Sequence, residues 1–154
     1  MENEWPAMEQ RGPVVSEAEV AAFEKRLGFV LPDDYRAFLL AVNGGQLDER
    51  NRRFDWGTVN WLLSLRDEDE SSDLDERRDL DPAAQLLFVG YDGFGCRLLV
   101  VLDGDHRGEV WYFDRLNERP ADANPRVAWH ERRDMKKLAG SWREFLASLR
   151  PIEG

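Results

Sequence analysis

Cysteine and histidine are scarce in this sequence, and their scarcity limits the chemistry open to it. Cys96 is the one cysteine among 154 residues, so no disulfide can form within the chain and no cysteine-based zinc site can be built. The two histidines, His106 and His130, lie far apart in the sequence and match no spacing typical of a metal site. We therefore expect no metal ion, and no motif indicates a cofactor.

Long hydrophobic runs are also missing. The longest apolar run, Leu98 to Leu102, is far too short to span a bilayer. Residues 1–6 are acidic and lack the basic start and the apolar stretch of a signal peptide. These two observations predict a cytoplasmic protein with no membrane partner.

Basic residues are fewer than acidic ones in this sequence. The sequence holds 21 Lys and Arg against 31 Asp and Glu, a formal net charge of −10. Such a surface repels phosphate groups, which argues against a nucleic acid or an anionic membrane as partner. It would attract a basic protein, but an acidic surface that serves solubility alone has the same composition. Both interpretations of the acidity stay open.

The chain does contain enough apolar residues for one folded domain. Hydrophobic residues make up 42% of it, with 8 Phe, 6 Trp and 3 Tyr, more aromatics than a disordered chain would carry. Pro6, Gly12 and Pro13 interrupt the first residues. We predict a flexible N-terminal arm without regular structure over residues 1–14, in which Trp5 is suited to contact the body, and a single domain over residues 15–154.

Residues 16–45 carry the start and stop signals of two consecutive helices. Ser16 and Glu19 have the spacing of a capping box, and Gly28 offers a left-handed stop to the first helix. The second helix begins near Pro32, and Asn43-Gly44-Gly45 ends it. Apolar residues recur at helical spacing in both helices. We expect five of them to be buried: Phe23, Leu27, Tyr35, Phe38 and Leu39.

The middle of the chain has the pattern of β-structure. Residues 59–65 alternate apolar and polar side chains, and Phe54 and Trp56 before them imply a bulge or bend at Gly57. Short turns separate three further strands and force antiparallel neighbours. The last strand is apolar on both faces, which implies either a sheet covered on two sides or an exposed aromatic patch. These strands are predicted at residues 86–91, 97–102 and 109–114.

A helix closes the predicted fold. Ser141 and Glu144 again have capping-box spacing, and an apolar stripe follows them. Met135 and Leu138 are expected to add a helical turn before it, after an irregular stretch over residues 116–125. Together these elements predict an α+β fold, in which the N-terminal helix pair and the C-terminal helix pack on a mainly antiparallel, twisted β-sheet.

The sequence contains no recognisable catalytic constellation. Cys96 follows a glycine at a strand start, and Arg97 would point to the opposite face, so we expect a small buried thiol rather than a nucleophile. Gly90, Gly93 and Gly95 fit turns and match no nucleotide-binding loop. We therefore predict that the protein is not an enzyme and has no catalytic residues.

The most unusual stretch is an acidic segment over residues 67–81, which has too few apolar residues to pack. A calcium loop starting at Asp67 would need glycine and glutamate where Ser72 and Arg78 stand. A solvated loop and a docking surface for a basic partner both fit this composition. If it is a docking surface together with neighbouring aromatics, the candidate partner-binding residues are Asp67, Glu68, Asp69, Glu70, Asp73, Asp75, Glu76, Trp56 and Trp111.

Three blocks of the sequence together resemble the SUKH superfamily, the immunity proteins related to fungal cell-wall assembly regulators. The first block is Ser16 to Gly45, with the restart Leu31-Pro32-Asp33-Asp34-Tyr35 and the ending Asn43-Gly44-Gly45. The second is Val89 to Gly95 with Gly108 to Asp114, which is similar to the family's central meander. The third is Ser141 to Leu146, similar to its closing helix. The acidic segment is peculiar to this chain.

The resemblance implies a protein-binding domain without catalytic residues. Bacterial members typically bind and neutralise a co-encoded toxin, often a nuclease, and nucleases tend to be basic because they bind phosphate backbones. The prediction is therefore an acidic immunity protein for a basic toxin domain. The alternative is a non-catalytic regulatory scaffold of the cell-wall regulator type. Neither the identity of the partner nor the oligomeric state follows from the sequence.

Overall fold

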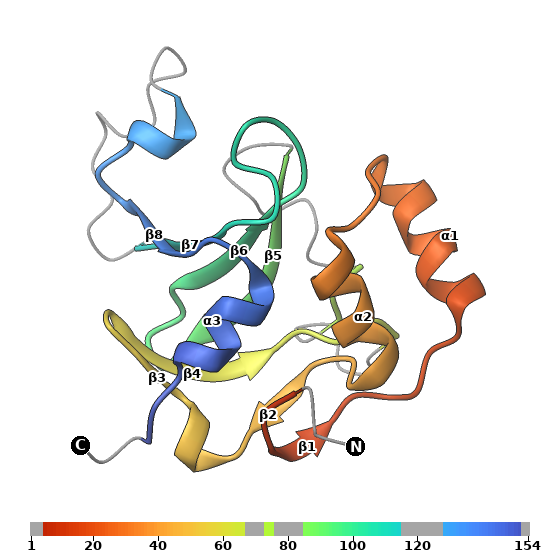
Figure 1. Ribbon diagram of the computed structural model, residues 1–154, viewed down its shortest axis with the longest axis horizontal. Helices are drawn as coiled ribbons and strands as arrows, with labels where there is room; N and C mark the ends of the chain where they lie inside the picture. The colour runs from red at the N-terminus through yellow and green to blue at the C-terminus, as the bar shows by residue number, and fades with distance from the viewer. Residues whose placement is uncertain (1–4, 67–72, 76–84, 115–127, 152–154) are drawn as a thin grey trace.

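The computed structural model of the protein describes residues 5–66, 73–75, 85–114 and 128–151. The described helices are α1 (Glu17–Leu27), α2 (Asp33–Ala41) and α3 (Trp142–Ser148). Figure 1 shows α1 and α2 beside each other at one end of the sheet, while α3 lies in front of the sheet in this view. This arrangement confirms the predicted α+β class.

The described strands form one eight-stranded sheet. Its order is β1-β2-β4-β5-β6-β7-β8, with β3 paired to β4 off this path, and every neighbouring pair is antiparallel. Three strands predicted from the sequence appear as β5, β6 and β7. The strands are β1 (Met8–Arg11), β2 (Gly45–Leu47), β3 (Arg53–Phe54), β4 (Gly57–Leu62), β5 (Leu86–Asp92), β6 (Arg97–Val101), β7 (Val110–Phe113) and β8 (Met135–Ala139).

The helix pair forms as its capping signals predict. The Ser16 hydroxyl accepts a hydrogen bond from the Glu19 amide at 3.1 Å, and the Glu19 carboxylate accepts one from the Ser16 amide at 2.9 Å. Gly28 stops α1 in the left-handed region, at φ 88°. Of the five residues expected in the core, Phe23, Tyr35, Phe38 and Leu39 are buried, and Leu27 is partly buried.

The Asn43-Gly44-Gly45 motif ties the end of the helix pair to the rest of the domain. Asn43 is 1% exposed and has φ +58°. Its side-chain amide donates to the carbonyls of Pro13 (2.7 Å) and Leu65 (2.8 Å), and its side-chain oxygen accepts from the Leu65 amide (2.8 Å). A Cβ on Gly45 would lie 2.2 Å from a backbone oxygen of β1, so only glycine lets β1 approach so closely.

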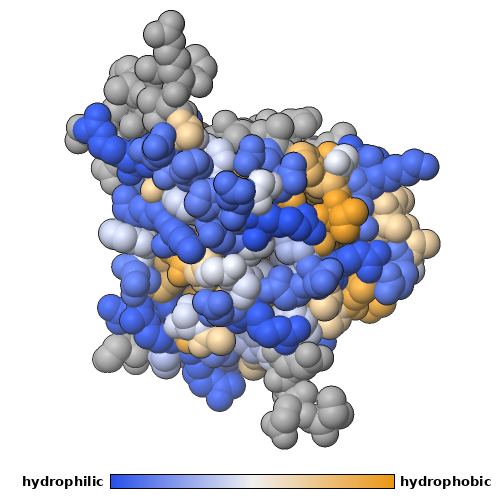
Figure 2. Space-filling view, turned by 45° about the horizontal axis from the view of Figure 1, so that its top comes forward, coloured by the Kyte–Doolittle hydropathy of each residue, from blue (hydrophilic) through white to orange (hydrophobic). Residues whose placement is uncertain are grey.

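The core forms where α2 and α3 meet the sheet, and the face of the molecule in Figure 2 is mainly hydrophilic with smaller apolar patches. Trp142 of α3 packs edge-on against Tyr35 of α2, with ring centroids 5.0 Å apart. Phe145, also of α3, lies 6.0 Å from Phe54 of β3. Burial of each such phenylalanine contributes roughly 1.5–3 kcal/mol, so these contacts hold α3 to the helix pair on one side and to the β3–β4 hairpin on the other.

The N-terminal arm contains a strand that the sequence analysis did not predict. The expectation of no regular structure over residues 1–14 is wrong for Met8–Arg11, which forms β1 and pairs with β2. Pairing with β2 gives these backbone groups hydrogen-bond partners, which the surrounding prolines and glycine do not prevent. The ring of Trp5 packs 5.5 Å from that of Phe38, which confirms that Trp5 contacts the domain.

Two further local predictions need correction. Of the bulge or bend predicted at Gly57, the bend is correct but is sharper than expected: the chain turns at Asp55 and Trp56 and pairs β3 with β4 as a hairpin. The helical turn expected around Met135 and Leu138 is the strand β8, which pairs with β7. The residues of this stretch favour a helix when taken alone, but pairing with β7 outweighs that local preference. The irregular stretch predicted over residues 116–125 lies outside the described residues.

Candidate partner-binding surface

The acidic segment is described at three residues, Asp73, Leu74 and Asp75, which the structure holds against the domain. Leu74 is 0% exposed, and its amide donates to the carbonyl of Ser64, just beyond the end of β4, at 2.8 Å. Asp73 forms an isolated parallel bridge with Ser64, and its carboxylate accepts the Asp75 amide at 3.0 Å. The expectation that the segment cannot pack is therefore wrong at this point, because one leucine anchors it in the core.

An ion pair fixes the same point to α1. Oδ2 of Asp75 lies 3.0 Å from both Nε and Nη2 of Arg26, in the last turn of the helix. The side chains are 25% and 46% exposed, and such a pair contributes only about 0.2–1 kcal/mol, so it orients the segment more than it stabilises the fold. Five candidate carboxylates lie outside the described residues: Asp67, Glu68, Asp69, Glu70 and Glu76.

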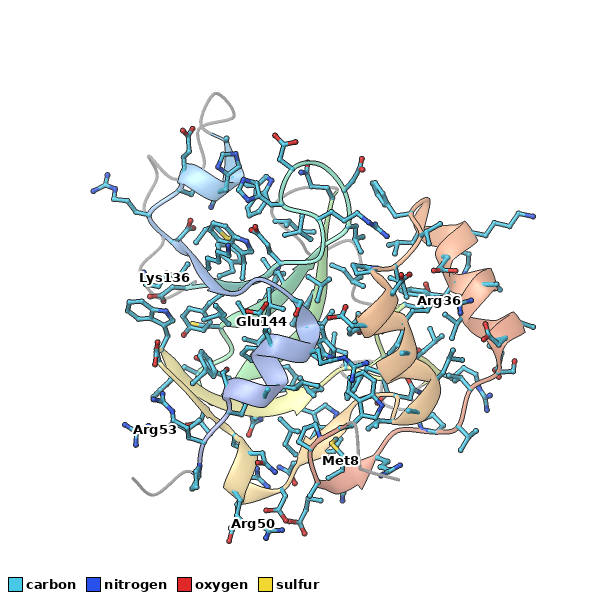
Figure 3. The ribbon with its side chains drawn as sticks, viewed as in Figure 1. Met8, Arg36, Arg50, Arg53, Lys136 and Glu144 are labelled. Carbon is cyan, nitrogen blue, oxygen red and sulfur yellow. The ribbon has the colours of Figure 1, made fainter. Side chains whose placement is uncertain are left out.

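Carboxylates of α1 near this point already have cationic partners. Figure 3 labels Arg36 of α2, whose Nη1 lies 2.7 Å from the carboxylate of Glu17. Arg66 lies 2.6 Å from the carboxylate of Glu19. The backbone amide of Ser16 and then the guanidinium of Arg66 lower the pKa of Glu19. Glu17 and Glu19 therefore serve contacts within the domain, as Asp75 does with Arg26.

Trp56 is exposed at the turn between β3 and β4. Its side chain is 53% exposed, and Nζ of Lys136 lies 5.0 Å from the centre of its ring. Beside it, Asp55 forms an ion pair with Arg150 at 3.0 Å. The neighbouring β5–β6 turn exposes a second aromatic, Phe94, at 78%. Trp56 therefore has the exposure that a partner-contact residue requires.

Trp111 lies inside the protein. It is 7% exposed, its indole N–H donates to the Glu109 carboxylate at 2.9 Å, and its ring packs 4.9 Å from that of Trp129. Of the two interpretations of its strand, burial on both faces is correct at Trp111 and the exposed aromatic patch is wrong. The strand's alternation showed that both faces are apolar, but it carried no information about what covers them. Trp111 therefore has almost no surface to offer a partner.

The structure does not bring the remaining candidates together. Trp56 precedes β4, whereas Ser64, which holds the acidic segment, follows it. A strand rises about 3.3 Å per residue, so the two points lie roughly 20–25 Å apart along the strand. Figure 1 shows β4 crossing the molecule from the β3–β4 turn toward α2. The described part of the acidic segment, residues 73–75, and Trp56 therefore lie at opposite ends of β4.

The groups considered for catalysis or metal binding have structural partners. Cys96 is buried, with Sγ 3.7 Å from Oδ1 of Asp114. Nδ1 of His106 lies 2.9 Å from the Glu109 carboxylate, and the His106 and His130 rings are 4.6 Å apart. Within the described parts of the chain, no three or more His, Cys, Asp or Glu side chains are grouped to hold a metal ion.

Sequence reasoning missed the contact between the β3–β4 turn and β8. Lys136 and Lys137 stand in a stretch predicted as helical, and Trp56 in a stretch predicted as a bend, so no local pattern joins them. The structure places them at one groove, lined by Phe54, Asp55, Trp56, Lys137, Leu138, Phe145, Ser148 and Arg150. This surface becomes visible only once the sheet is formed, because the pairing of β8 with β7 brings Lys136 and Lys137 close to the β3–β4 turn.

Comparison with known proteins gives one family. The model of the SMI1 / KNR4 family (SUKH-1) matches residues 14–148, a span that includes all three blocks on which the resemblance rests. A search of curated proteins finds no match to the chain. Among the described residues, no helix has both the length and the apolar character needed to cross a membrane.

Proposed function

The chain belongs to the SMI1 / KNR4 family (SUKH-1), and from this membership we propose that it is an immunity protein that binds a basic toxin domain and neutralises it by contact. In this proposal it acts in the cytosol, catalyses no reaction and requires no cofactor. The toxin it neutralises is a product of its own genome, encoded beside it. The regulatory scaffold role is the second candidate, and both roles depend on binding another protein.

One observation carries the proposal: the acidic segment is fixed to the domain at Leu74. Seven carboxylates stand among residues 67–76, and the buried side chain of Leu74 with its hydrogen bond to Ser64 holds two of them, Asp73 and Asp75, at a defined point beside α1. A wholly solvated loop has no need of a fully buried anchor. The anchor supports a role in which the position of the negative charge matters.

The charge would act mainly on the rate of association. A concentrated negative region attracts a basic partner and raises association rates by roughly 10 to 1,000-fold, an effect that salt screens over about 8–10 Å. A nuclease binds its phosphate substrate with cationic side chains. An acidic segment seated on those side chains would exclude the substrate without changing any covalent bond, which agrees with a domain that acts by binding.

Co-expression tests the proposal in cells. The toxin domain encoded next to this gene is produced in a host cell with and without the protein. We expect the protein to restore growth and to form a stable complex with that domain on purification. Protection should weaken in a variant that loses four negative charges of the acidic segment. This variant combines Asp67→Ala, Glu68→Ala, Asp69→Ala and Glu70→Ala.

A matched variant controls for net charge. Glu9, Glu49, Asp103 and Asp105 are exposed outside the acidic segment, and replacing these four by Ala removes the same charge. This control should protect as well as the wild-type chain. Equal loss of protection in both variants would show that net charge matters and the segment does not. A stable partner recovered from cells without any such toxin gene would favour the scaffold role instead.

A further inference from the structure

A groove opens between the β3–β4 turn, β8 and α3, at the end of β4 far from Asp73 and Asp75. Its volume is about 190 Å³. Phe54 and Phe145 supply apolar surface, and the half-exposed ring of Trp56 stands at the rim. Figure 3 shows Lys136 and Arg53 on this side of the molecule, with the β3–β4 turn between them in this view. A cavity of this size accepts one side chain of a bound segment.

The rim of the groove is positive in a protein that is strongly negative. Arg150 is paired with Asp55 at 3.0 Å, and Lys137 with Glu109 at 3.3 Å, so their charges are largely compensated. Lys136 leans over Trp56, and Arg53 is exposed next to the turn. Neither Lys136 nor Arg53 has a carboxylate partner among the described residues. The charges that line the groove are therefore paired, and Lys136 and Arg53 add positive charge beside it.

The strand that borders the groove stands last in the sheet. β8 pairs with β7 on one side, and no described strand pairs with its other side. An edge strand presents backbone N–H and C=O groups that an extended segment of another protein can pair with. Lysine on an edge strand discourages indiscriminate pairing with other strands. The same lysines attract a segment that carries carboxylates.

We propose that this groove binds an extended, acidic segment of a partner protein, which adds to β8 as a further strand. An apolar side chain of that segment fills the cavity against Phe54 and Phe145, and flanking carboxylates reach Lys136 and Arg53. The groove lies at the other end of β4 from Asp73 and Asp75 and takes a partner of the opposite charge, so the inference goes beyond the proposed function. It gives the domain two docking surfaces of opposite sign.

Displayed peptides test the proposal. A library of short random linear peptides is panned against the purified full chain, and the enriched peptides are sequenced. We expect an excess of Asp and Glu around one aromatic or aliphatic residue. Affinities for the enriched peptides are then measured with Trp56→Ala and with Lys136→Glu combined with Arg53→Glu. Each variant should lose at least about tenfold in affinity, as expected for an anchor residue or a charge reversal.

Lys25→Glu combined with Arg11→Glu is the matched control, because both residues are exposed on other elements and neither has a carboxylate partner among the described residues. It should bind the peptides as the wild type does. Hydrogen exchange of the Lys136–Ala139 amides should slow on binding, which reports strand addition directly. Circular dichroism of each variant shows whether it is folded. If the charge-reversed variant does not fold, Lys136→Gln takes its place.

Several results would overturn the proposal. They are failure of any peptide to enrich, enrichment without acidic bias, and equal binding to the wild type and the charge-reversed variant. Self-association of the protein that is lost in the Asp67-to-Glu70 alanine variant would identify a second copy of this chain as the occupant instead. The same alanine variant distinguishes the two proposals. If it still binds the peptides but no longer protects from the toxin, the groove acts independently of the proposed immunity function.

Discussion

Asp75 and Arg26 form an ion pair at 3.0 Å although they are 49 positions apart in the sequence. The pair joins the acidic segment to the last turn of α1, next to the buried side chain of Leu74. A stretch whose composition is typical of a solvated loop is thereby held at one point by a core contact and by a surface contact. The two contacts have different strengths and can be tested separately.

The surface contact should orient the segment and contribute little stability. We expect Arg26→Ala, Asp75→Ala and the double variant to give a coupling energy of about 0.2–1 kcal/mol in urea unfolding, because both side chains are partly exposed. The coupling should shrink in high salt. A coupling above about 2 kcal/mol would show that the pair is a main structural bond, which contradicts the assignment.

The core contact should matter far more. Leu74→Ala is expected to lower the free energy of unfolding by about 2–5 kcal/mol, the usual cost of truncating a buried leucine. Val14→Ala, at a side chain 89% exposed, is the control and should change stability by less than about 0.5 kcal/mol. If Leu74→Ala behaved like the control, Leu74 would not anchor the acidic segment and the proposed function would lose its main support.

Asn43 should be among the most sensitive polar positions. Asn43→Ala removes three hydrogen bonds to buried or partly buried backbone groups and puts alanine at a positive φ that asparagine tolerates better, so we expect a loss of about 2–4 kcal/mol. Asn43→Gly removes the same bonds but tolerates the backbone conformation. The glycine variant should therefore be more stable than the alanine variant in thermal or urea unfolding, and the reverse order would refute the strain component.

Stability should fall at high pH because of Tyr112. Burial, followed by its hydrogen bond to Asp92 at 2.6 Å, raises the pKa of Tyr112 above its ordinary value of 10.0. Above about pH 10 the unfolded chain loses this proton while the folded chain keeps it, so the free energy of unfolding decreases by at most about 1.4 kcal/mol per pH unit from this group. Below pH 10 the stabilisation is fully present.

Tyr112→Phe isolates that contribution. The variant loses a hydrogen bond to a buried carboxylate, so it should be less stable at neutral pH by about 1.5–3 kcal/mol. Its stability should also decline less steeply than that of the wild type between about pH 10 and 11.5. Parallel pH profiles for the two proteins would mean that Tyr112 does not contribute to the alkaline loss.

The sequence predicted best where local signals and tertiary structure agree. The caps at Ser16 and Gly28 and the apolar spacing of the helix pair need only neighbours within a few residues, and the helices form where those signals stand. The strands β5, β6 and β7 could be predicted for the same reason, because the short turns between them define antiparallel partners. The family resemblance covered the same blocks and is confirmed by the match over residues 14–148.

Prediction failed where distant pairing decides the local structure. Met135–Ala139 contains good helix formers and becomes β8 only because β7 pairs with it, and the polar stretch Met8–Arg11 becomes β1 only through β2. The candidate surface was missed in part for the same reason. Alternation shows that Trp111 lies in a two-sided apolar strand but not that it is covered, and nothing local links Trp56 to Lys136.

The central claim is that the acidic segment guides a basic toxin domain to this protein. The most direct measurement is the stopped-flow association rate with the toxin domain encoded beside the gene, taken from low to high salt. We predict a rate that falls steeply with salt, and a low-salt rate at least about tenfold lower after alanine replaces Asp67, Glu68, Asp69 and Glu70. The charge-matched control at Glu9, Glu49, Asp103 and Asp105 should keep most of the wild-type rate. A low-salt rate unchanged by the Asp67-to-Glu70 replacement would contradict the claim.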